Sequence, residues 1–184
     1  LTLSVDSLTP PTPYLSTMPS RAVNAITAGL LLILAVALVV QFGFLTPPLD
    51  PSDYENATLT VRDGNGTELA TVDVRIADTD RKRYVGLSET ANLDPGEGML
   101  FVHDGVDTRA YVMRNMSFPL DILFLAPNGT ITTIHHAPTE PGVSGDELTK
   151  YEGRGKYVLE VPRGYTNETG IDEGDTVEIP DGIE

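Results

Sequence analysis

The 184-residue sequence contains no cysteine. This absence excludes disulfide bonds, thiol catalysis and thiolate metal sites. Established catalytic motifs are also missing: there is no Gly-x-Ser-x-Gly segment, no phosphate-binding loop and no His-Glu-x-x-His segment. With 40% hydrophobic residues, the chain is long enough for one domain with an ordinary core plus appendages.

Basic residues are scarce. Twelve Lys and Arg stand against 27 Asp and Glu, which gives a net charge of -15, and only three of the basic residues are lysines. Such a surface is typical of proteins adapted to high salt, where self-repulsion is screened; an ordinary acidic secreted protein is the alternative. A nucleic-acid partner is not expected, because phosphate binding needs a basic face.

Charge is absent altogether from residues 22–44. As a helix this stretch would be about 34 Å long, enough to cross a hydrocarbon core of about 30 Å. A cleavable signal peptide is the competing interpretation, but no convincing Ala-x-Ala site ends the stretch. Arg21 precedes it and acidic residues follow it, so the positive-inside rule predicts a C-terminal domain outside the cell.

The sequence therefore divides into four parts. Residues 1–21 are expected to be a disordered tail or a start-site artefact, and 22–44 a transmembrane anchor. A proline-bearing linker follows at 45–56, and 57–184 form the extracytoplasmic domain.

Short strands joined by turns dominate that domain. Residues 69–77 alternate apolar and polar side chains, which predicts one face in the core and one in water. The Asp63–Gly66 turn joins this strand to another at 58–62. Between 78 and 89 the alternation breaks, and a short helix is expected with Asp78 or Thr79 as its N-cap. Further strands are expected at 99–102, 110–113, 120–125, 130–136, 156–161 and 176–179.

This pattern predicts an all-β fold, a jelly-roll-like sandwich or small barrel of about eight strands with one short helix, behind the N-terminal transmembrane helix. A long loop at 137–154 is rich in proline, glycine and acidic residues.

Polar residues interrupt the central strands where a plain core would have aliphatic residues. Arg114 and Asn115 end one predicted strand, and Asp121 enters the next. We expect these three side chains to converge at one mouth of the fold, with Tyr111 or Phe118 as an apolar wall. Arg114 would supply a planar donor fork for a carboxylate or a phosphate.

Asp121 and Glu160 are carboxylates on otherwise apolar strand faces, which is costly unless they are paired or hydrogen-bonded. Arg83, Arg109, Arg114 or backbone N–H groups could satisfy them. Alternatively, Arg114 and Asn115 could present donors to a ligand in a cleft. A third possibility is an acid–base pair, which in a glycosidase needs about 5–10 Å between the carboxyl groups.

No metal site and no cofactor are expected. His135 and His136 are adjacent, so on a strand they point to opposite faces and cannot easily share a metal. His103 is the only other histidine, and an ordinary surface role is expected for it.

Five asparagines lie in Asn-x-Ser/Thr sequences, more than chance predicts. We expect N-glycosylation at the four in predicted loops, turns or linkers, which are Asn56, Asn65, Asn128 and Asn167. Asn115, placed at the end of a core strand, is expected to stay unmodified.

A family resemblance rests on six ordered motifs between Val72 and Ile179. They are Thr79 with Arg83 and Gly86-Leu87, Gly98–Phe101, Met113–Asn115, Pro119–Ile122, Tyr157–Val161, and Gly170-Ile171 with Gly174-Asp175. The pattern resembles the domain of unknown function 192 family, small exported or membrane-anchored prokaryotic domains. The resemblance implies a β-rich, jelly-roll-like fold and no established activity.

Three functions remain open from the sequence. The first is a membrane-anchored extracytoplasmic module that binds a small molecule or an envelope partner through Tyr111, Arg114, Asn115 and Asp121. The second is a hydrolase of cell-surface polymers with Asp121 and Glu160 as its acid–base pair. The third is a structural envelope protein.

Overall fold

The computed structural model describes residues 30–34, 36–37 and 49–183. The chain divides into two units, residues 1–48 and 49–184. In the first unit, 30–34 and 36–37 are helical. The rest of the predicted anchor at 22–44, the tail at 1–21 and the linker at 45–48 lie outside the described residues.

Within the described part of the chain, none of the helices combines the length and the apolar character that crossing a membrane requires. The transmembrane helix expected at 22–44 is thus not supported by the structure and stays a prediction.

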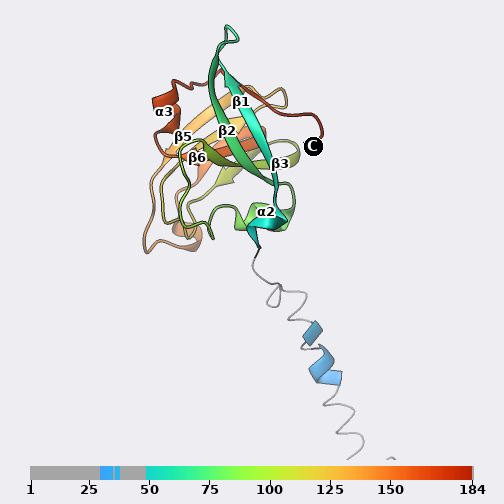
Figure 1. Ribbon diagram of the computed structural model, residues 1–184. Coiled ribbons are helices and arrows are strands. Elements are labelled where there is room, and N and C mark those ends of the chain that lie inside the picture. The colour runs from blue at the N-terminus through green and yellow to red at the C-terminus, as the bar shows by residue number, and fades with distance from the viewer. Residues whose placement is uncertain (1–29, 35, 38–48, 184) are drawn as a thin grey trace, which may run out of the picture. The chain divides into compact units, whose positions relative to one another are not determined.

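The second unit is mostly β, as predicted (Figure 1). Its elements in chain order are η1 (Pro51–Asp53), β1 (Glu55–Arg62), β2 (Glu68–Ala77), α2 (Asp80–Val85), β3 (Glu97–Tyr111), β4 (Leu120–Leu125), β5 (Ile131–Ala137), η2 (Gly145–Glu147), β6 (Tyr151–Pro162), α3 (Tyr165–Thr169) and β7 (Thr176–Glu178).

The strands of residues 49–183 form one seven-stranded sheet in the order β5-β4-β6-β3-β2-β1-β7. All neighbours are antiparallel except β2 and β3, which run parallel because α2 and its following loop carry the chain back across the sheet. The sheet curls into a half-barrel, so the expected jelly-roll-like sandwich of two sheets is wrong and the barrel-like alternative describes the fold better.

The two edges of the curled sheet meet at Gly129. Its carbonyl oxygen accepts a hydrogen bond from the Val177 backbone N–H at 2.9 Å, and Ile131 N–H donates to the Asp175 carbonyl oxygen at 2.8 Å. Gly129 has φ +82°, and a Cβ there would lie 2.0 Å from the Val177 carbonyl oxygen. Only glycine therefore permits this approach of β7 to the β4–β5 turn.

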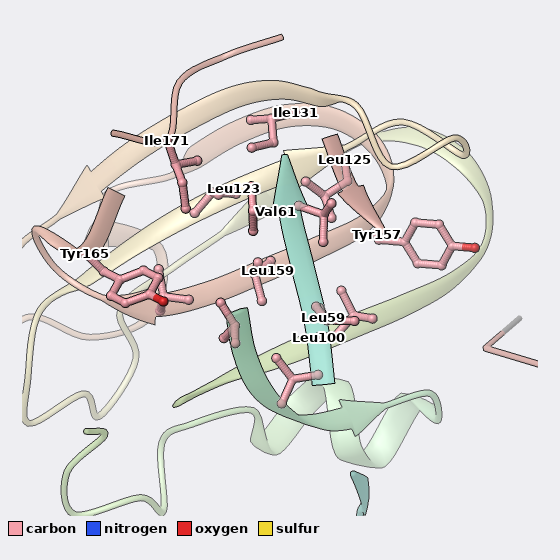
Figure 2. Close-up of a cluster of buried hydrophobic side chains, with 14 of the residues drawn as sticks. Leu59, Val61, Leu100, Leu123, Leu125, Ile131, Tyr157, Leu159, Tyr165 and Ile171 are labelled. Carbon is pink, nitrogen blue, oxygen red and sulfur yellow. The ribbon is translucent and has the colours of Figure 1, made fainter. Parts of the chain in front are cut away.

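The concave face of the sheet holds the inner cluster (Figure 2). Alternate residues of β1 and β2 point into it, as the sequence pattern predicts, and Tyr165 of α3 covers one end. Its buried residues are Leu59, Val61, Val72, Val74, Ile76, Leu100, Val102, Leu123, Leu125, Ile131, Tyr157, Leu159, Val161, Tyr165, Ile171 and Val177.

The opposite face holds the outer cluster, which consists of Tyr54, Ala77, Leu87, Met99, Phe101, Met113, Leu120, Ile122, Phe124, Ala137 and Val158. All six residues of β4 are buried, because this strand contributes to both clusters. The outer face is covered by Tyr54 after η1, by the chain around α2 and by the segment between β3 and β4.

Several local predictions are confirmed. β4 has the predicted bounds, and the Asp63–Gly66 turn is closed by Gly66 N–H donating to the Asp63 carbonyl oxygen. Thr79 is the N-cap of α2, its hydroxyl oxygen accepting from Lys82 N–H at 3.3 Å.

Two local predictions are wrong. The strand expected at 99–102 and the first half of that expected at 110–113 are parts of the single strand β3, which ends at Tyr111, because pairing with β6 resumes at Asp107 after an interruption. The loop expected at 137–154 ends earlier, at the start of β6. Helix α3 was not anticipated, because its five residues carry no helical periodicity.

Candidate functional site

A cavity of about 520 Å³ opens on the outer face of the sheet, where the cover is incomplete. Its walls come from α2 and the residues after it, from β3, and from the turn at 112–116. Six polar residues lining it carry the chemistry: Arg83, His103, Arg109, Tyr111, Arg114 and Glu160.

Glu160 of β6 is the buried acid of this cavity. Its side chain is on the outer face, where its cross-strand neighbours are Met99 of β3 and Ile122 of β4, both apolar. Glu160 is 6% exposed, and its carboxyl group forms no hydrogen bond or ion pair within the described part of the chain. Burial raises the pKa of Glu160 to about 8 from 4.5, so the group is mostly a neutral carboxylic acid at pH 7.

A protrusion of β3 forms one wall. Val102 pairs with Tyr157 and Asp107 with Gly155, so residues 103–106 leave the ladder. This interruption places the Nε2 atom of His103 2.9 Å from the Tyr111 hydroxyl. Burial and the nearby Arg109 and Arg83 lower the pKa of His103 to about 4, and burial raises the pKa of Tyr111. His103 and Tyr111 thus share a hydrogen bond between two uncharged groups, and the histidine tautomer sets which of them donates.

Tyr111 also forms an apolar wall. Its ring packs edge-on against Phe101 at 5.1 Å and against Phe124 at 5.8 Å between centroids. These contacts fix the ring in the cavity wall, with its hydroxyl hydrogen-bonded to His103.

Arg83 ties α2 to the sheet. Its guanidinium donates to the carbonyl oxygens of Asp78 and Val102 at 2.7 and 2.6 Å, and pairs with the Asp80 carboxylate at 2.7 Å. Asp80 is the only acidic lining residue besides Glu160, and Arg83 neutralises it.

Arg109 and Arg114 retain unused donors. Arg109 donates through Nη2 to the Gly105 carbonyl oxygen at 2.9 Å, which closes the protrusion, while its buried Nε–H has no acceptor among residues 49–183. Arg114 donates to the Tyr84 carbonyl oxygen and stacks 3.9 Å above the Tyr84 ring, which is 70% exposed. Three arginines and a mostly neutral Glu160 make this cavity positive on a chain whose net charge is -15.

Comparison with known proteins places the fold. The profile of the domain of unknown function 192, described as "Uncharacterized ACR", matches residues 60–179. The chain belongs to this family. The resemblance found in the sequence motifs is thereby confirmed, and the family's description assigns no activity.

Two solved structures resemble this member of the domain of unknown function 192 family at 28% identity and a TM-score of 0.61. One is a candidate transcription regulator from Sinorhizobium meliloti. The aligned region covers 68% of this chain and 94% of that chain. The other is a protein of unknown function from Novosphingobium aromaticivorans, for which the shares are 73% and 93%. No curated protein matches.

Asp121 does not line this cavity. Asp121 is fully buried on the inner face and accepts hydrogen bonds from His136 Nδ1 at 2.6 Å, Gly164 N–H at 3.0 Å, and the Thr166 N–H and hydroxyl at 3.2 and 2.8 Å. It caps the start of α3 and needs no arginine. The expected convergence of Arg114, Asn115 and Asp121 is therefore wrong.

Of the other predicted residues, Arg114 and Tyr111 line the cavity and Asn115 does not. Asn115 is exposed in a turn after β3, at φ +56°, so the core-strand argument against its glycosylation is wrong. Asn56, Asn65, Asn128 and Asn167 are all exposed, although Asn56 is in β1 and Asn167 in α3.

Asp121 and Glu160 lie on opposite faces of the sheet. Asp121 is paired across β4 and β6 with Val161 of the inner cluster, whereas Glu160 is paired with Ile122 of the outer cluster. They do not share a cleft, which an acid–base pair requires.

The first test separates Asp121 from Arg114. We expect Asp121→Ala to lower the free energy of unfolding by about 3–5 kcal/mol, because it leaves four donors without their acceptor, two of them on the buried Thr166. Arg114→Ala removes an exposed stacking contact and should cost less than about 1 kcal/mol. Urea unfolding of both variants measures the difference; equal losses would contradict the assignment.

The second test concerns the protonation of Glu160. Because its pKa is raised in the fold, its stabilising contribution is fully present below pH 4.5 and is lost as pH rises through about 8. The free energy of unfolding of wild type relative to Glu160→Gln should fall by about 1.4 kcal/mol per pH unit in that window. Glu168→Gln, at an exposed glutamate of α3, is the matched control. If the free energy of unfolding changes with pH equally in wild type and Glu160→Gln, Glu160 is ionised in the fold and the prediction is wrong.

Proposed function

We propose that the domain is a binding module for a small organic anion, which it holds in the cavity between α2, β3 and the turn at 112–116. The observation that carries this proposal is Arg109, whose buried Nε–H has no acceptor among the described residues, in a cavity that is also lined by two further arginines and by Glu160, a carboxyl group only 6% exposed. Buried polar groups in native proteins are nearly always satisfied, so an unsatisfied one requires an explanation. A ligand that completes its hydrogen bonding supplies one.

The cavity supports the same proposal. Its volume of about 520 Å³ is in the range of small-molecule sites, which combine apolar walls with a few polar groups. Phe101 and Leu120 supply apolar wall, and Arg109 has a buried donor without an acceptor. Guanidinium groups bind carboxylate and phosphate groups well.

Another hollow of about 610 Å³ lies over β1 and β2, lined among others by Asp73, Arg75 and Glu97. Its charged side chains are exposed or half-buried, and Arg75 donates to the Thr90 hydroxyl at 3.0 Å. No buried group there lacks a partner within the described residues. The cavity at Glu160 is therefore the better candidate.

Transcriptional regulation through DNA contact, suggested by the Sinorhizobium meliloti relative, has less support in this chain. DNA binding depends on neutralising phosphates with Lys and Arg, and the net charge here is -15. The hydrolase interpretation requires Asp121 and Glu160 in one cleft, but the two residues lie on opposite faces of the sheet. A structural envelope role is the outcome if no ligand binds.

To test the proposal, the full chain is titrated with succinate, malate, citrate and inorganic phosphate, with binding followed by calorimetry and thermal shift. At least one of these anions should bind and raise the melting temperature. Arg109→Gln should weaken that binding about tenfold, the loss expected for one charge-assisted hydrogen bond. Arg154→Gln, at an exposed arginine that does not line the cavity, is the control. Equal affinities for both variants, or no binding of any anion, would contradict the proposal.

We also propose that the domain works outside the cell, attached through residues 22–44, in a glycosylated and salt-adapted form. The uncharged stretch, Arg21 before it and the acidic residues after it support this orientation. Protease added to intact cells should digest the domain and leave a membrane-bound fragment. Protection of the whole domain would reverse the orientation, and a freely secreted domain would show that 22–44 is cleaved.

A further inference from the structure

The residues paired directly with Glu160 across the sheet are apolar. Met99 lies opposite it on β3 and Ile122 opposite it on β4. The two paired residues offer no hydrogen-bonding group, and Glu160 lines the cavity, so a ligand in the cavity can bond to its carboxyl group. A hydrogen bond at this position therefore depends on the ligand.

The arginines do not compensate for Glu160. Burial raises the pKa of Glu160, and no hydrogen bond or ion pair joins its carboxyl group to an arginine within the described residues. The pKa of Tyr111, in contrast, is affected by Glu160 and also by Arg109 and Arg83. Glu160 belongs to β6, whereas Arg83, Arg109 and Arg114 belong to α2, β3 and the turn at 112–116, so the acidic group and the cations come from different walls of the cavity.

We propose that Glu160 selects the ligand by donating its own proton in a hydrogen bond, so that the ligand is an organic acid with a carboxylate or phosphate at the arginine end and an uncharged acceptor oxygen at the other end. This inference rests on the proposed function, because it assumes that the cavity holds an anion. A carboxylic acid is both donor and acceptor, whereas a carboxylate only accepts.

The alternative occupant is a ligand with an ammonium group beside Glu160. That group would require an ionised carboxylate at a site with apolar neighbours, where ionisation is costly. The two alternatives have opposite pH dependence, since ionisation of Glu160 removes the donor in the first and creates the ion pair in the second.

Few other groups of the cavity titrate near neutral pH. His103 of β3 titrates near pH 4, and the pKa of Tyr111, also of β3, is raised above 10. Arg83 and Asp80 of α2 form an ion pair, and arginines stay charged throughout. The residues that β4 turns to this face, such as Leu120 and Ile122, are apolar. A change in binding between pH 6.5 and pH 9 therefore reports on Glu160.

Three probes that share a pentanoate chain and differ at its fourth carbon test the inference. 4-Oxopentanoate, 4-methylpentanoate and 4-aminopentanoate share the carboxylate and differ at one position, which is a carbonyl oxygen, a methyl group or an ammonium group. Their affinities for the full chain are measured by ligand-observed NMR at pH 6.5 and pH 9. At pH 6.5 the oxo acid should bind about fivefold to tenfold more tightly than the methyl acid, as one hydrogen bond allows. At pH 9 that preference should be lost.

Variants assign the preference to Glu160. Glu160→Gln keeps a donor that cannot ionise, so the oxo acid should stay preferred at both pH values. Glu160→Leu removes the donor and should abolish the preference at both. Glu168→Gln should behave as wild type, because Glu168 is exposed on α3.

The remaining outcomes separate the two proposals. Tightest binding of the amino acid, with affinity rising toward pH 9, would overturn the inference in favour of a cationic ligand group. Equal binding of all three probes, unaffected by Glu160→Gln but weakened by Arg109→Gln, would overturn the role of Glu160 and keep the anion site. Failure of all three to bind would contradict the proposed function itself.

Discussion

The structure depends on the need to bury both faces of one sheet. β4 and β6 contribute apolar side chains to the inner and the outer cluster. The curl of the sheet closes the inner face, and the contact of β7 with Gly129 holds that curl. The outer face has no second sheet to cover it, so α2, the β3 protrusion and the segment before β4 must do so. The candidate cavity is the part of the outer face that these short segments leave open, and Glu160 lies within it.

The two buried carboxylates show what strand alternation predicts and what it omits. Asp121 and Glu160 present the same sequence pattern, one acid among apolar strand residues, and alternation assigns each to a face. The partners are set by tertiary structure instead. Asp121 meets donors from β5 and from the start of α3, 15 to 45 residues away. Glu160 meets none within the described chain. Burying a charge without partners is costly, so one acid is satisfied by the fold and the other remains protonated.

The other sequence predictions are confirmed or wrong according to how far apart in the sequence the interacting residues lie. The Asp63–Gly66 turn, the Thr79 cap and the bounds of β4 depend on a few adjacent residues, so the sequence predicts them well. The six motifs also identify the family. The continuity of β3 depends on pairing with β6, some 45 residues later, and could not be read locally. For the same reason the arginines of the cavity could be named as available cations, but only the fold shows that Arg83 and Arg109 line it with Arg114 while Asp121 does not.

The charge of the whole chain and the charge of the cavity act over different distances. A net charge of -15 repels an approaching anion at long range, and this repulsion is screened within about 3 Å at 1 M salt but only within about 10 Å at 0.1 M. The hydrogen bonds that Arg109 and Glu160 would form with the proposed ligand act at contact distance in a partly desolvated cavity, where salt weakens such bonds much less. High salt therefore removes the obstacle to association while leaving the contacts that give specificity. An acidic surface and an anion-binding cavity are compatible in one domain if it works in concentrated salt, and the neutral form of Glu160 avoids adding a further negative charge where the ligand must bind.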